Sequence, residues 1–89
     1  MKRAMFIKTV KLGVSDALLY KLSDPVKFCG DQETFDVVVS AVTGPMDIKV
    51  ATVFPSDKEG KILSFESIKE TQGTLDHEAP LVELGYESV

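Results

Sequence analysis

The pattern of apolar and polar residues predicts a chain built mainly from β-strands. Residues 34–43 give the strongest strand signal, because three consecutive valines favour a pleated backbone. Their near-continuous apolarity indicates a central strand covered on both faces. Residues 47–54 place Ile48, Val50, Thr52 and Phe54 on one face if they are extended, and residues 61–65 follow a short polar loop that ends at Gly60. We therefore expect a three-stranded antiparallel meander over residues 34–65.

The N-terminal part also favours extended structure. Residues 4–12 are rich in strand formers and predict a first strand, and residues 17–22 place alternate apolar side chains on one face if they are extended. Pro25 disfavours helix at the residue before it, so we expect residues 23–25 to turn or kink the chain.

The C-terminal part changes character and predicts one short helix at residues 75–84. Thr74 or Asp76 is the expected N-terminal cap, and Gly85 suits the C-terminal end. Pro80 is tolerated only near the start of a helix, which keeps the regular part short. The polar stretch before it leaves room for a helical turn at residues 67–70. The residues expected to face the sheet are Leu75, Ala79, Val82 and Tyr86.

Together these elements predict a strand-rich α+β fold. We expect a mainly antiparallel sheet of three to five strands and one short C-terminal helix. At 89 residues the chain is expected to form a single domain, residues 1–89, because one hydrophobic core does not divide at this length.

Composition agrees with a folded chain: 44% of the residues are apolar and 27% are charged. The formal net charge is −4, and it is unevenly placed. Residues 1–30 carry six basic and two acidic side chains, whereas residues 31–89 carry four basic and twelve acidic ones. An acidic chain makes nucleic acid an unexpected partner. The polarity along the chain could support head-to-tail contacts or contacts with another protein.

The compartment is expected to be the cytoplasm. The basic residues Lys2 and Arg3 precede a short apolar run, but Lys8 interrupts it, so we do not expect a signal peptide. No segment approaches the roughly 20 apolar residues that cross a bilayer, and we expect no membrane association. A single cysteine, Cys29, excludes an internal disulfide and fits a reducing environment.

Candidate chemistry is sparse. Asp76, His77 and Glu78 form the most polar group around a possible general base, yet neighbouring residues of a helix point in different directions. Cys29 has only Lys27 nearby in sequence as a group that could activate a thiol. We expect no metal site, because Cys29 and His77 are the only soft ligands, and no cofactor, because phosphate-binding glycine motifs are absent.

Several segments resemble small bacteriophage-encoded proteins of unassigned function. They are Val37-Val38-Val39-Ser40-Ala41, Val53-Phe54-Pro55 with the following Asp-Lys-Glu-Gly loop, Gly73-Thr74-Leu75-Asp76-His77-Glu78-Ala79, and Leu84-Gly85-Tyr86. The resemblance spans residues 35–87, whereas Pro80 and the N-terminal third depart from the pattern. It implies a phage accessory protein in a bacterial cytoplasm, and it implies no reaction.

The expected function is therefore binding of a host or phage protein by a non-enzymatic homo-oligomer. One short helix covers one face of a sheet, so apolar residues on the other face would need a partner. Val38, Val42 and Val53 are the expected interface residues. The alternative is a small-molecule binding or sequestering protein, for example for a nucleotide, or a small enzyme with a site between subunits. For that alternative the expected ligand-binding residues are His77, Asp76 and Tyr20, with Asp24 as a further polar group.

Overall fold

The structure is a computed structural model that describes residues 2–89. Its element order is given by the following bounds: β1 (Lys2–Leu12), β2 (Ser15–Phe28), β3 (Gln32–Thr43), a 3₁₀ turn at Pro45–Asp47, β4 (Lys49–Ser56), β5 (Lys69–Gln72), α1 (Ala79–Glu83) and β6 (Tyr86–Ser88). The strands form one sheet in the order β5-β4-β3-β2-β1-β6. All neighbouring strands are antiparallel except β1 and β6, which are parallel. The strand-rich α+β expectation is confirmed, and the sheet is mixed and has six strands, more than expected.

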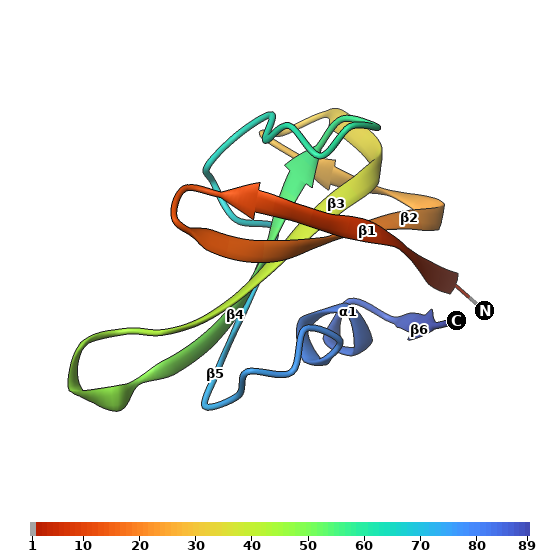
Figure 1. The fold of residues 1–89 in the computed structure, drawn as a ribbon. Helices are drawn as coiled ribbons and strands as arrows, with labels where there is room; N and C mark the ends of the chain where they lie inside the picture. The colour runs from red at the N-terminus through yellow and green to blue at the C-terminus, as the bar shows by residue number, and fades with distance from the viewer. Residues whose placement is uncertain (1) are drawn as a thin grey trace.

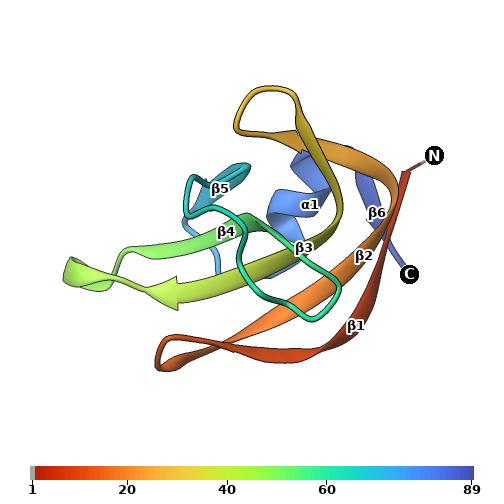
Figure 2. The same ribbon diagram turned by 90° about the horizontal axis from the view of Figure 1, so that it is seen from above.

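The sheet curls strongly, and α1 lies inside the curve (Figures 1 and 2). Figure 1 also shows the β3–β4 hairpin extending away from the rest of the molecule, and β6 beside the N-terminal end of β1. The two outermost strands of the sheet, β5 and β6, are consecutive in sequence and are connected by α1. No helix among the described residues is long and apolar enough to cross a membrane.

The core on the α1 face of the sheet is built from alternate residues of the strands. Its fully buried members include Val37, Val39 and Val53 from β3 and β4, and Leu81 from α1. Tyr86 of β6 closes this core, and its hydroxyl donates to the backbone carbonyl of Asp24 at 2.7 Å. The short helix contacts the sheet chiefly through Leu81, and Leu84 directly after it packs against the same core.

The opposite face of the sheet has its own cover. Ala17, Leu19 and Val38 form a second buried cluster there, against which Ile62 packs. Ile62 belongs to residues 57–68, a segment without regular strands that folds back across the sheet. An edge-on contact between Phe54 and Phe65, with ring centroids 6.1 Å apart, holds the segment in place. This cover overturns the argument that one short helix would leave a whole face exposed.

The predicted strand at residues 61–65 is wrong, so the predicted meander is confirmed only in its first two strands, β3 and β4, which pair antiparallel. Only an isolated bridge joins Ser56 and Ile62, because the loop turns out of the sheet after β4. The side chain of Asp57 stabilises this turn, since its Oδ1 accepts the backbone N–H groups of Glu59 and Lys61, both at 2.9 Å. The consecutive antiparallel strands are instead β1 to β5, each paired with the next along the chain.

Other local expectations are confirmed in part. The strands expected at residues 4–12 and 34–43 are β1 and β3, each slightly longer. The strand expected at 17–22 continues past Pro25 to Phe28, because a shift of register between Lys21 and Val26 absorbs the proline within β2. The stretch that left room for a helical turn contains β5 instead.

The helix is shorter than expected and shows a different side to the sheet. It begins only at Ala79, directly before Pro80, and a glycine with φ +92°, Gly85, follows its C-terminal end. Leu81 is 1% exposed, whereas Val82 is 62% exposed, so the expected sheet-facing position is wrong by one residue.

Candidate functional site

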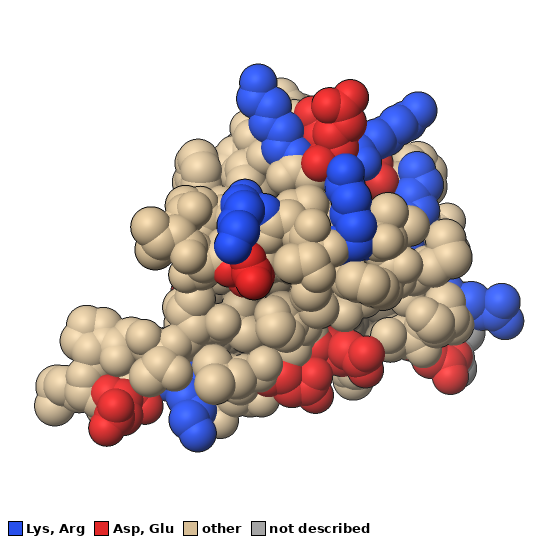
Figure 3. Space-filling view, viewed as in Figure 1, with Lys and Arg blue, Asp and Glu red and all other residues tan. Residues whose placement is uncertain are grey.

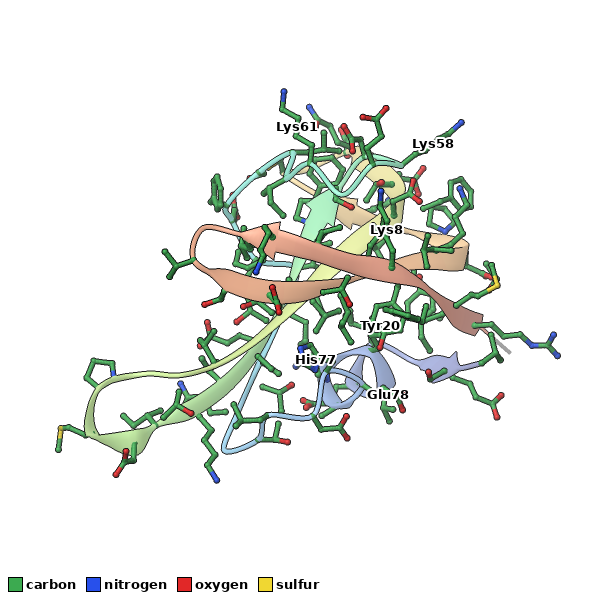
Figure 4. The ribbon with its side chains drawn as sticks, viewed as in Figure 1. Lys8, Tyr20, Lys58, Lys61, His77 and Glu78 are labelled. Atoms are coloured by element: carbon green, nitrogen blue, oxygen red, sulfur yellow. The ribbon has the colours of Figure 1, made fainter. Side chains whose placement is uncertain are left out.

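The residues expected from the sequence to bind a ligand meet near the start of α1. Figure 4 shows Tyr20 of β2 pointing toward the turn that carries His77 and Glu78. Burial raises the pKa of Tyr20, and the negative charges of Glu78 and Asp76 raise it further. The structure therefore brings Tyr20 close to the acidic turn.

Two of the polar side chains of this turn, Asp76 and Glu78, already accept hydrogen bonds within the chain. Asp76 Oδ1 accepts the backbone N–H of Glu78 at 2.9 Å, and the Glu78 carboxylate accepts the hydroxyl of Ser88 at 3.0 Å. Asp76 thus shapes the turn before α1 and does not cap the helix itself. Neither of the two hollows described below is lined by Asp76, His77 or Tyr20. Asp76 and Glu78 stabilise the turn before α1 through their hydrogen bonds.

The three expected interface valines lie in different surroundings. Val38 and Val53 are fully buried, one on each face of the sheet, and neither side chain reaches the surface. We therefore withdraw both from the interface. Val42 is half-buried on the β3–β4 hairpin, opposite Val50.

Cys29 lies in the tight turn between β2 and β3, beside a hollow of about 200 Å³. Its Sγ lies 3.3 Å from the Ser64 hydroxyl and 4.0 Å from a carboxylate oxygen of Glu66. A nucleophilic thiol needs a base or a cation beside it. The thiol is exposed, and its contacts are not those of an activated nucleophile.

A second hollow, of about 280 Å³, lies where β1, β2 and the C-terminal residue meet. Arg3, Met5 and Lys21 are among the residues that line it. Both volumes fall below the roughly 300–1,000 Å³ of ordinary small-molecule sites. Within residues 2–89 there is also no group of three side chains placed to hold a metal ion, and no buried side-chain nitrogen or oxygen lacks a hydrogen-bond partner.

The outer edge of β1 is the surface that the sequence analysis missed. β1 pairs with β6 only through Lys2–Ala4, and the Val89 N–H extends this contact to the carbonyl of Ala4 at 3.0 Å. Beyond that point no described strand pairs with this side of β1. The free edge therefore runs from Met5 to Leu12 and, at roughly 3.3 Å per residue, is about 26 Å long.

Three consecutive apolar side chains are exposed along this edge. Met5, Phe6 and Ile7 are 49%, 47% and 44% exposed. Met5 and Phe6 pair regularly with Lys21 and Tyr20, whereas the register of β1 against β2 shifts between Phe6 and Lys8 and places Ile7 in a bulge. Phe6 contacts the buried Tyr20 edge-on, with centroids 6.0 Å apart, and so adjoins the core on the α1 face of the sheet, whereas Met5, opposite Lys21, points to the other face. The three consecutive hydrophobic residues are evident in the sequence. Only the structure shows that they lie at an unpaired strand edge and are exposed there.

Comparison with known proteins identifies no relative. No protein-family model matches the chain, and no curated protein and no solved structure is significantly similar to it.

Proposed function

We propose that this chain is a small non-enzymatic interaction module that binds an extended segment of another protein along the free edge of β1. One observation carries the proposal: an unpaired strand edge coincides with the exposed side chains of Met5, Phe6 and Ile7. Unpaired backbone N–H and C=O groups at a sheet edge are a template for an added strand. In such complexes the main chain supplies affinity and the side chains of the edge supply specificity.

The bacterial phage setting implied by the sequence resemblance is part of the same proposal. An accessory protein without a catalytic site would act by binding a host or phage protein, which is what a free strand edge allows. The alternative, a small-molecule binder or a site between subunits, rests on His77, Asp76 and Tyr20, which do not line either of the two hollows described above.

Selection from a library of random peptides displayed on a carrier tests the proposal. We expect enriched peptides to bind the unmodified chain and to bind Ile7→Ser poorly. Ile48→Ser is the matched control, because Ile48 is 53% exposed at the far end of the β3–β4 hairpin. Peptides that bind both variants equally well, or a library that yields no binder, would refute the assignment to β1.

We propose self-association only through strand edges, because α1 packs on one face of the sheet and Ile62 packs on the other. Light scattering at micromolar concentration measures it directly against the chain mass of 9.7 kDa. A larger mass that Ile7→Ser restores to the monomer value would assign the β1 edge to a second copy.

A further inference from the structure

The charge of β1 is unlike that of the whole chain. Residues 2–12 contain four basic side chains and no acidic one, although the chain has a formal net charge of −4. Lys8 and Lys11 follow directly after the apolar patch, within the free part of the edge. Lys11 is paired with Asp16, with Nζ and Oδ1 2.6 Å apart, whereas Lys8 makes no ion pair with any residue from 2 to 89.

A neighbouring loop adds cations on the same side. Figure 4 shows Lys8, Lys58 and Lys61 pointing away from the body of the molecule at the end where β1 and residues 57–61 lie together. Gly60 of that loop lies against Val10, since a Cβ at Gly60 would be 2.8 Å from Val10 Cγ1. In the space-filling view of Figure 3 basic side chains gather at this end, with a few acids among them, and acidic side chains prevail at the opposite end. The carboxylate of Asp57 is turned inward onto backbone N–H groups of its own loop.

Building on the proposed function, we infer that the partner of β1 is an extended, acidic segment of a different protein, with apolar side chains at one end and carboxylates at the other. The apolar end packs on Met5, Phe6 and Ile7, and the carboxylates face Lys8 and the lysines of the loop. Opposite charges along paired strands stabilise the pairing, and like charges directly opposite destabilise it.

A second copy of the chain fits this edge poorly. Two β1 strands would bring their lysines together. The other outer strands among the described residues are β5 and β6, of four and three residues, and both are too short to cover the edge from Met5 to Leu12. Nucleic acid is disfavoured by the acidic net charge.

Two synthetic peptides of about ten residues, long enough to cover the edge, test the inference. Both alternate valine with a charged residue in their second half, glutamate in one and lysine in the other, after the same apolar first half. We expect the acidic peptide to bind about tenfold more tightly at about 50 mM salt, and the difference to shrink at about 500 mM salt because ions screen exposed charges. Hydrogen exchange measured by NMR should show new protection of amides within residues 5–12.

Lys8→Glu tests the charge itself, and Lys49→Glu is its control, because Lys49 is an exposed lysine of β4 on the distant hairpin. We expect Lys8→Glu to weaken binding of the acidic peptide about tenfold and Lys49→Glu to leave it unchanged.

The outcomes separate this inference from the proposed function. Equal binding of both peptides with protection of residues 5–12 would overturn the acidic partner and leave β1 as a binding edge. Binding without protection at this edge, or no binding of either peptide together with a failed library selection, would overturn both. A single-stranded oligonucleotide that protects the same amides more strongly than the acidic peptide would also overturn the inference.

Discussion

Leu81 and Val82 lie on different sides of α1, and only one of these sides packs on the sheet. The apolar pattern of the sequence favours Val82 as a sheet-facing residue, but the structure buries Leu81 to 1% exposure and leaves Val82 62% exposed. Truncating each residue to alanine therefore distinguishes the two interpretations, and the neighbouring residue serves as the matched control.

The expected loss for Leu81→Ala is large relative to the stability of the chain. Removing a fully buried leucine side chain costs about 3 kcal/mol, from lost burial and from the cavity that remains. A domain of 89 residues has a total free energy of unfolding of roughly 4–13 kcal/mol. Leu81→Ala should consequently remove a large share of the stability, whereas Val82→Ala should change it by less than about 0.5 kcal/mol.

Urea denaturation followed by circular dichroism measures both variants. With a slope of about 1 kcal/mol per molar urea, the midpoint of Leu81→Ala should fall by about 3 M, and its Tm should fall by about 15 °C. The midpoint of Val82→Ala should stay near that of the unmodified chain. A loss for Val82→Ala equal to or greater than that for Leu81→Ala would show that the helix packs in the other orientation.

Three further variants test the loop and the C-terminal strand. Gly60→Ala should cost about 2 kcal/mol in urea denaturation, because φ is +91° and the new Cβ would meet Val10. Asp57→Ala should destabilise the chain near neutral pH and lose its effect in acid: backbone hydrogen bonds lower the pKa of Asp57 below 3.8, so its contribution is present above that pH and disappears as the pH falls through the lower folded value. Tyr86→Phe should cost about 1 kcal/mol, because the hydrogen bond to the Asp24 carbonyl is lost.

Each of these three variants has a control or an outcome that would contradict the expectation. Gly13→Ala also has a positive φ, +66°, but no atom within 4 Å of the new Cβ, so a loss as large as that of Gly60→Ala would argue against the contact with Val10. A destabilisation by Asp57→Ala that is the same at every pH would contradict a role of the ionised carboxylate. Equal unfolding midpoints for Tyr86→Phe and the unmodified chain would show that water replaces the lost hydrogen bond at no cost.

The sequence by itself determined the strands whose local pattern is strong. β1 and β3 were predictable because β-branched residues and near-continuous apolar runs favour a pleated backbone. Pro80 and Gly85 likewise placed a short helix near the C-terminus, since one cannot lie deep inside a helix and the other readily adopts a positive φ after it.

Only the tertiary structure decided how these elements cover one another. Residues 61–65 have the local pattern of a strand, but Ile62 is used to cover the second face of the sheet, where Leu19 and Val38 need apolar contacts. This choice depends on residues far apart in the chain and leaves no local signal. The same holds for the edge of β1, because pairing is a property of two strands, and which residues of β1 find a partner in β6 leaves no local signal in either strand.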